Sequence, residues 1–254
     1  MITAGIDMGA KAIKVIILKD GEILSESMVM SGREKEKLAQ QALDEALKKA
    51  GISRGDIARI IATGAGRKRV PFADDDVTEV SADARGTSWL FPSARTVIAV
   101  GAEEGRGIKC DEQGKVVDFA INEKCAAGAG SFTEAMSRAL ELKLEDMAEL
   151  SLQAQGEAAI NAQCAVFAES EVVSLVHSKT PKADIARAVH DAIASRITSM
   201  VRTVGVGKDV ALIGGLARNV GFVDSLKRGL EMDLLIPEEP EFVGALGAAL
   251  VAAG

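Results

Sequence analysis

The feature of this sequence that most restricts its fold is a unit of three strands and two turns that occurs twice. The first copy consists of residues 2–7, 12–19 and 22–30, with turns at Gly9-Ala10 and Asp20-Gly21. The second copy consists of residues 96–100, 107–111 and 115–121, with turns at Gly101-Ala102 and Gln113-Gly114. β-Branched residues favour strands, and Gly-containing turns connect them. Because one supersecondary unit is repeated, we predict two similar lobes that face each other.

Periodic apolar patterns predict helices between and after these two units. The predicted helices are residues 33–50, 81–91, 132–142, 144–154, 163–177, 181–204, 219–230 and 242–253. Further short strands are predicted at residues 57–62, 209–213 and 234–237. This order of elements is typical of an α/β protein. We predict a first lobe of residues 1–95, completed by a C-terminal helix at 240–254, and a second lobe of residues 96–239.

Composition limits the partners and the compartment. The 254 residues are 48% hydrophobic but only 3% aromatic, so the core is expected to be large and aliphatic. The net charge of −7 gives no electrostatic basis for binding nucleic acid or an anionic membrane. The chain contains no apolar run of the roughly 20 residues that a membrane helix needs. Three cysteines and an N-terminus that enters a strand directly favour a reducing, cytoplasmic compartment over secretion.

Three Gly-containing turns follow predicted strands, at Gly9, at Gly101 and at Gly214-Gly215. Glycine lets backbone N–H groups approach phosphate oxygens closely. A single turn of this kind is weak evidence, but three of them, two on the repeated unit, indicate a nucleotide cleft between the lobes. The Walker A and G-x-G-x-x-G patterns are both absent, which argues against P-loop and Rossmann folds.

Two cysteines each precede a predicted helix. Cys125 comes before the small-residue turn 126–130, and Cys164 comes before the helical run 165–171. The N-terminus of a helix stabilises a thiolate, so the pair suggests ligands for a metal centre. Two buried thiols are the alternative interpretation, and a structural zinc is a weaker one because zinc needs four ligands. His177 and His190 are expected on helix surfaces, and Cys110 is expected to be a neutral thiol within a strand.

Several of these segments resemble a known superfamily. Gly5-Ile6-Asp7-Met8-Gly9, the Gly101 turn and residues 211–219 resemble the two phosphate segments and the adenosine segment of the actin/Hsp70/sugar-kinase superfamily. Within it, the segments 125–132 and 163–171 resemble the signatures of one family. That family comprises the ATP-dependent activators of 2-hydroxyacyl-CoA dehydratases and the ATPase subunits of benzoyl-CoA reductase.

The resemblance implies a two-lobed fold with duplicated ribonuclease-H-like lobes, and ATP with Mg²⁺ between them. It also implies a [4Fe–4S] cluster shared across a dimer, to which this chain contributes Cys125 and Cys164. Asp7 is expected near Mg²⁺ and the attacking water, and Glu103 is a candidate for orienting that water. The residues expected to bind the nucleotide are Gly9, Ala10, Lys11, Lys14, Gly101, Ala102, Gly214, Gly215 and Leu216.

The implied function is ATP-driven delivery of low-potential electrons, from ferredoxin or a similar donor, to an acyl-CoA reductase or dehydratase component. Two positions depart from the family pattern. Ala10 stands where Ser or Thr is usual, and the segment 99–104 lacks the usual acid before the turn and the Gln-Asp pair after it. This form is closer to the D-type subunit of benzoyl-CoA reductase, and the main expectation is therefore a subunit of that enzyme.

The altered segment also favours a heterodimer with a paralogous ATPase subunit, with a homodimer as the alternative. An activator of a 2-hydroxyacyl-CoA dehydratase is the alternative function within the family. Two functions of other classes stay open: a small-molecule kinase of the same superfamily, and a non-enzymatic filament protein of the actin type. Neither would account for the two cysteine segments.

Overall fold

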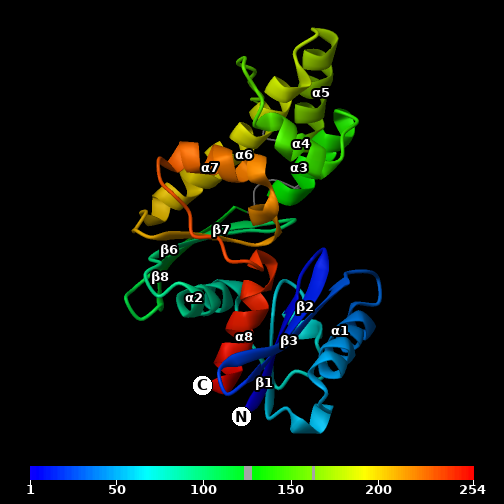
Figure 1. Cartoon of the computed structure of the whole chain (residues 1–254), viewed down its shortest axis with the longest axis vertical. Coiled ribbons are helices and arrows are strands. Elements are labelled where there is room, and N and C mark those ends of the chain that lie inside the picture. Colours follow the sequence, from blue (N-terminus) through cyan, green and yellow to red (C-terminus); the bar gives the residue numbers. More distant parts are fainter. Residues whose placement is uncertain (123–127, 162–163) are drawn as a thin grey trace.

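The protein contains two mixed β-sheets with helices packed around them (Figure 1). The structure is a computed structural model that describes residues 1–122, 128–161 and 164–254. The first sheet has the order β3-β2-β1-β4-β5, formed by β1 (Ile2–Met8), β2 (Ala12–Lys19), β3 (Glu22–Met30), β4 (Arg59–Thr63) and β5 (Asp75–Asp76). The second has the order β8-β7-β6-β9, formed by β6 (Thr96–Val100), β7 (Gly105–Cys110), β8 (Val116–Asn122) and β9 (Val210–Ile213).

The two sheets share a four-strand topology, to which the first sheet adds the short edge strand β5. In each, three consecutive strands form an antiparallel meander, and the first of them pairs in parallel with a strand that comes later in the chain. The predicted duplication and the two-lobed α/β fold are thereby confirmed. The helices are α1 (Lys35–Ala50), α2 (Glu79–Leu90), α3 (Ala129–Ala139), α4 (Leu144–Ser151), α5 (Ala165–His177), α6 (Lys182–Val204), α7 (Val220–Leu230) and α8 (Val243–Ala253). Short 3₁₀ turns occur at Arg54–Asp56, Arg67–Arg69, Gly215–Arg218 (η3) and Pro240–Phe242 (η4).

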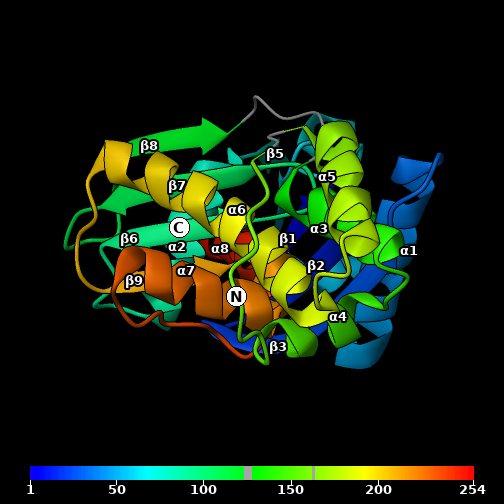
Figure 2. The same cartoon turned by 90° about the horizontal axis from the view of Figure 1, so that it is seen from above.

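Each sheet is covered on both faces. Helix α1 packs on one face of the first sheet and α8 on the other, while α6 and α7 cover the second sheet opposite α2 (Figures 1 and 2). Ser25 and Ser27 fix the edge strand β3 to α1, because their hydroxyls donate to the carbonyls of Ala46 and Ala42. Helices α3, α4 and α5 extend the second lobe away from the first (Figure 1).

Helix α8 lies between the lobes and is packed at backbone distance. A Cβ atom added at Gly247 would lie 1.8 Å from the carbonyl oxygen of Ala82 in α2. A Cβ atom at Gly5 in β1 would likewise lie 2.0 Å from the carbonyl oxygen of Ala245. The small residues of α8 therefore let it contact both the first sheet and α2. Since α2 also packs on the second sheet, it connects the lobes, and the predicted boundaries at 95/96 and 239/240 stay predictions.

Two short segments differ from the sequence prediction. Asp75 and Asp76, where no strand is predicted, form a two-residue edge strand parallel to β4, although both stay exposed. Residues 234–237, expected as a strand, form only an isolated bridge between Leu235 and Ala211. Strands this short depend on the neighbour that they pair with, and local sequence does not specify that neighbour.

His190 was expected on a helix surface, and this prediction is wrong. Its side chain is fully buried in α6, and neither ring nitrogen has a hydrogen-bond partner among the described residues. Helix α7 packs against the ring closely, since a Cβ atom at Gly221 would lie 2.6 Å from His190 Nδ1. Burial lowers the pKa of His190 to about 4, and the opposing effect of Asp191 does not outweigh it.

His190 should make the fold less stable in acid. The unfolded chain binds a proton at this side chain near pH 6.5, whereas the folded protein resists protonation down to about pH 4. Stability is therefore expected to fall as the pH decreases through this window, by about 3 kcal/mol in total. His190→Leu should remove this part of the pH dependence in urea titrations between pH 7 and 4.5. His177→Leu, at an exposed histidine on α5, is the control. Equal pH dependence in both variants would contradict the prediction.

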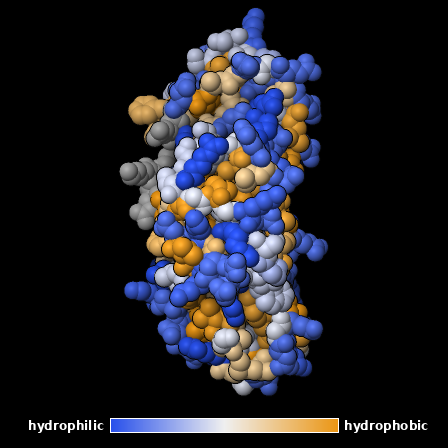
Figure 3. All heavy atoms as spheres, turned by 90° about the vertical axis from the view of Figure 1, so that its left-hand side faces the viewer, coloured by the Kyte–Doolittle hydropathy of each residue, from blue (hydrophilic) through white to orange (hydrophobic). Residues whose placement is uncertain are grey.

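The surface of the molecule is mixed in character. On the face shown in Figure 3, hydrophilic and hydrophobic side chains alternate along the whole length. Within the described parts of the chain, no helix combines the length and the apolar character that a membrane span requires.

Candidate functional site: the cleft between the lobes

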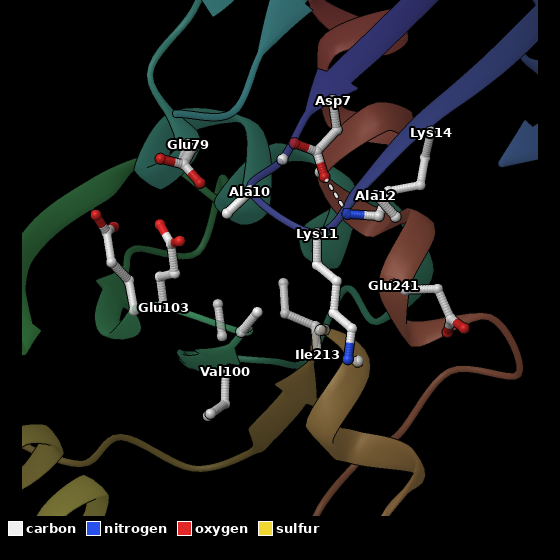
Figure 4. A pocket seen from close by; sticks show the side chains of 18 of the residues that line it. Asp7, Ala10, Lys11, Ala12, Lys14, Glu79, Val100, Glu103, Ile213 and Glu241 are labelled. Carbon is white, nitrogen blue, oxygen red and sulfur yellow. Dashed lines mark hydrogen bonds and ion pairs between the residues drawn. The ribbon is translucent and has the colours of Figure 1, made fainter. Parts of the chain in front are cut away.

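A cavity of about 280 Å³ lies where the turns of the two sheets meet (Figure 4). Its lining comes from the β1–β2 turn, the β6–β7 turn, the turn after β9, and the first residues of α2 and α8. The predicted site residues that line it are Asp7, Gly9, Ala10, Lys11, Lys14, Gly101, Ala102, Glu103, Gly214 and Gly215. Leu216 does not line the cavity. Its side chain is 6% exposed and belongs to the core of the second lobe, so a side-chain contact with nucleotide is not supported.

The two repeated turns close with the same hydrogen bond. The N–H of Gly9 donates to the carbonyl of Ala12 over 3.1 Å, and the N–H of Gly101 donates to the carbonyl of Glu104 over 2.9 Å. The third turn needs glycine for a different reason. Gly214 has a φ of +90°, and a Cβ atom there would lie 2.5 Å from the carbonyl oxygen of Val100. All three turns thus present backbone to the cavity, as the phosphate-binding interpretation requires.

Asp7 and Lys14 form an ion pair in the cavity wall. Lys14 Nζ lies 2.8 Å from Asp7 Oδ2, and both side chains are 15% exposed (Figure 4). The Asp7 carboxylate packs closely against Gly64, where an added Cβ atom would lie 2.4 Å from Asp7 Oδ1. The turn after β4 therefore shapes the cleft by leaving space for this carboxylate. An oriented carboxylate beside phosphate-binding turns can hold Mg²⁺ or orient a water molecule.

The second lobe has no counterpart of Asp7. Aligning Gly9 with Gly101 through their shared hydrogen bond matches Asp7 with Ala99, which also lines the cavity. Carboxylates enter the cavity from other elements instead, as Glu79 and Asp83 of α2 and as Glu103 and Glu104 of the second turn. Figure 4 shows Glu79 and Glu103 on the same side of the cavity, across from Lys14.

Arg106 of β7 joins three of these acids. Its guanidinium lies 2.9 Å from Glu79, 3.1 Å from Asp83 and 3.3 Å from Glu104. Burial raises the pKa of the Asp83 carboxyl and that of Glu79, while the cation of Arg106 opposes both shifts. For Arg106 itself, burial favours the neutral form, but the two acids of α2 outweigh it and raise its pKa. This ion-pair cluster ties α2 and β7 to the second phosphate turn.

Glu79, Asp83 and Arg106 are not among the site residues predicted from the sequence. One signal was available for Asp83, which lies on the buried face of α2 with Val80, Ala84 and Thr87. A carboxylate at a position with core spacing needs a buried cation as its partner. The sequence offered no comparable indication that Arg106 would be that partner.

The second turn is bonded directly to the start of α3. The N–H of Gly130 donates to the carbonyl of Gly101 over 3.2 Å. The N–H and the hydroxyl of Ser131 both donate to the carbonyl of Ala102, over 3.1 and 3.0 Å. A Cβ atom at Gly128 would lie 2.1 Å from Glu103 Cα, so the two backbones touch. The second turn and the first turn of α3 are therefore in direct contact.

The two predicted cluster ligands differ in what can be said of them. Cys125 lies outside the described residues. Cys164 is exposed, free and at the N-cap of α5, next to Val166 and Phe167, which are each 68% exposed. Cys110 is buried at the end of β7, and burial raises the pKa of its thiol to about 11, as expected of an inert cysteine. Within the described ranges, no three His, Cys, Asp or Glu side chains form a metal-binding group.

Comparisons with known proteins show relatives that match nearly the whole chain. The activator of lactoyl-CoA dehydratase from Anaerotignum propionicum is 40% identical over 99% of this chain and 97% of its own length. The solved structure of the activator of 2-hydroxyisocaproyl-CoA dehydratase from Clostridium difficile, with bound ADPNP, has a TM-score of 0.93 and 36% identity to this chain. That match covers 99% of this chain and 94% of the other.

The D-type subunit of benzoyl-CoA reductase from Thauera aromatica is a more distant relative. It is 31% identical over 98% of this chain and 92% of its own length. The comparisons thus support the alternative expectation, a dehydratase activator, better than the main one. The model of the BadF/BadG/BcrA/BcrD ATPase family matches residues 4–252. This chain therefore belongs to the BadF/BadG/BcrA/BcrD ATPase family.

Proposed function

We propose that this chain is the ATP-hydrolysing activator of a 2-hydroxyacyl-CoA dehydratase. The observation that carries the proposal is the cavity in which two repeated Gly turns, the Gly214-Gly215 turn and Asp7 converge. Relatives named as activators of such dehydratases are 36–40% identical to this chain, against 31% for the benzoyl-CoA reductase relative. The preference for the dehydratase system rests on this difference.

In the proposed site, backbone N–H groups of the two repeated turns, other than those of Gly9 and Gly101 that close the turns, bind the phosphates of ATP. Asp7 either orients the attacking water or holds Mg²⁺ through a water molecule. Lys14 provides a positive charge for the phosphates. Glu103 extends from the opposite turn and is the second candidate for orienting water. The Gly214-Gly215 turn faces the nucleoside. ATP binding draws the two repeated turns, and hence the two lobes, toward each other.

Cys125 and Cys164 would provide two of the four thiolate ligands of a [4Fe–4S] cluster, and a second subunit would provide the other two. The described residue of this pair fits such a role. Cys164 is free and exposed, and it lies at the N-cap of α5. When bound, the cluster would supply one-electron redox chemistry at low potential.

The bonded contact between the second turn and α3 supports a coupling between nucleotide and electron transfer. The segment that carries Cys125 lies between β8 and α3, and α3 begins on the carbonyls of Gly101 and Ala102. A nucleotide that moves this turn would move the start of α3 with it. ATP binding and hydrolysis would thereby change the surroundings of Cys125.

Iron and sulfide analysis of anaerobically purified protein tests the cluster. The wild type should contain roughly two irons per chain, half of a four-iron cluster. Cys164→Ser should lose most of this iron, whereas Cys110→Ser, at the buried inert cysteine, should keep it. If Cys164→Ser keeps its iron, the assignment of Cys164 is wrong. If the wild type lacks iron, the proposed electron transfer is wrong, although ATP binding would stand.

A role with benzoyl-CoA reductase is the second candidate. The observation that favours it is the altered segment 99–104, in which Ala99 occupies the position that Asp7 has in the first copy of the repeat. Assays with each acceptor component distinguish the two, because ATP hydrolysis should be coupled to reduction of the correct component alone. The mass of the purified complex would also show whether the second subunit is another copy of this chain or a paralogue.

A further inference from the structure

Two methionines line the cleft without a role in the site as described. Met28 and Met30 belong to β3, the edge strand of the first sheet, and they are 45% and 60% exposed. Both line the same cavity as Asp7, Gly214 and Gly215. Contact between large apolar side chains and water is unfavourable. A ligand that covers them in the cavity would therefore be stabilised.

The strand register explains why they face the cavity. Met28 pairs with Lys14 and Met30 pairs with Ala12, and both partners also line the cavity. Ser25 and Ser27 point to the opposite face, where their hydroxyls bond to α1. Helix α8 covers the cavity-side face of β2 at Ile16 and Leu18, farther along the strand from the turn. The two methionines therefore form an apolar patch beside the phosphate turns.

The cavity has further apolar lining after β9. Ile213, Gly214, Gly215 and Pro240 contribute to it, next to the acid Glu241, and a Cβ atom added at Gly215 would meet nothing within 4 Å. The strand β3 is two strands away from β1, which places the methionines about 10 Å to the side of the Gly9 turn. A ligand whose phosphates bind at Gly9 and Gly101 would thus reach this apolar part of the cavity with its other end.

We infer that Met28 and Met30 form the first-lobe wall of the nucleobase site and contact the face of the purine ring of bound ATP. Thioethers pack well on aromatic rings, and unbranched methionine adjusts its shape as the cleft closes. This inference rests on the proposed function, because it takes ATP as the ligand. It adds that the first lobe, and not only the Gly214 turn, contributes to recognition of the base.

Binding measurements with and without the base test the inference. The double variant Met28→Ala/Met30→Ala should bind Mg·ATP about tenfold more weakly than the wild type. Its affinity for Mg·tripolyphosphate, which has no base, should be unchanged. The control is Ile23→Ala/Leu24→Ala, which removes two exposed apolar side chains from the same strand outside the cavity. Unchanged ATP affinity in the methionine variant, or an equal loss for tripolyphosphate, would overturn the inference.

Methyl NMR of the wild type provides a second measurement that does not depend on a variant's folding. With ¹³C-methyl-labelled methionine, the Met28 and Met30 signals should move upfield when ATP is added, because they lie over an aromatic ring. Tripolyphosphate should not produce this shift. If ATP binds and neither signal moves, the methionines do not touch the base. If neither compound binds at all, the proposed ATP site itself is wrong.

Discussion

Replacing Arg106 with methionine should lower the free energy of unfolding by about 3–5 kcal/mol at neutral pH. The Arg106 side chain is 12% exposed, and its guanidinium pairs with Glu79, Asp83 and Glu104. Methionine keeps much of the volume but removes the charge, so the buried carboxylate of Asp83 loses its cation. Urea unfolding of the two proteins at pH 7.5 measures the difference.

The deficit should depend on pH in a defined direction. Burial already raises the pKa of Asp83 and of Glu79, and loss of the cation raises both pKa values further. A carboxyl whose folded-state pKa is raised favours folding at low pH, and this contribution is lost as the pH rises through the folded pKa. The Arg106→Met deficit should therefore be smaller at pH 5 than at pH 8. His190 does not affect this comparison, since it is present in both proteins.

Two further variants separate the charge effect from a packing effect. Arg106→Met/Asp83→Asn should recover much of the lost stability, because the uncompensated buried charge is gone. Arg218→Met removes another arginine that pairs with two acids, Glu239 and Glu241, but its side chain is 48% exposed. That loss should stay below about 1 kcal/mol. Equal losses for Arg106→Met and Arg218→Met would contradict the view that burial makes the Arg106 cluster important.

The parts of the site that depend on local sequence were predictable. Gly9 and Gly101 follow short β-branched strands, and Gly214 follows another, so their turns could be found without the fold. The repeat of the meander then indicated that these turns would meet. The structure agrees, and the three turns line one cavity together with Asp7.

The rest of the site depends on how distant elements pack. Glu79 and Asp83 enter the cleft only because α2 crosses to the second sheet, where Arg106 points toward them from β7. His190 shows the same limit. Its spacing from Ala186, Ile193 and Ile197 is that of the core face of α6, but a histidine on such a face is unusual. In both cases the missing information was which distant element packs against the residue, because strand and helix patterns do not specify it.

Asp7→Asn should reduce the turnover number of ATP hydrolysis by about 10²- to 10⁴-fold while leaving the fold intact. Asparagine has the same shape, so it fits the space that Gly64 and Gly244 leave around the side chain. It cannot accept a proton from water, and it binds Mg²⁺ more weakly than a carboxylate does. Lys14 also loses its charged partner at 2.8 Å, which frees its ammonium group for the phosphates. ATP should therefore still bind. Single-turnover hydrolysis experiments separate the loss of catalysis from any change in ATP binding.

The comparison with Glu103→Gln decides which carboxylate acts on water. Both side chains line the cavity, but they come from opposite turns of the repeat (Figure 4). If Asp7 is the catalytic residue, Glu103→Gln should keep the rate of ATP hydrolysis within about tenfold of the wild-type rate, a smaller loss than removal of a general base causes. Asp75→Asn, at an exposed acid of β5 outside the cavity, should match the wild type. A large loss for Glu103→Gln with activity retained in Asp7→Asn would instead assign the water to the second turn. Hydrolysis would then take place at the turn whose carbonyls accept hydrogen bonds from the start of α3.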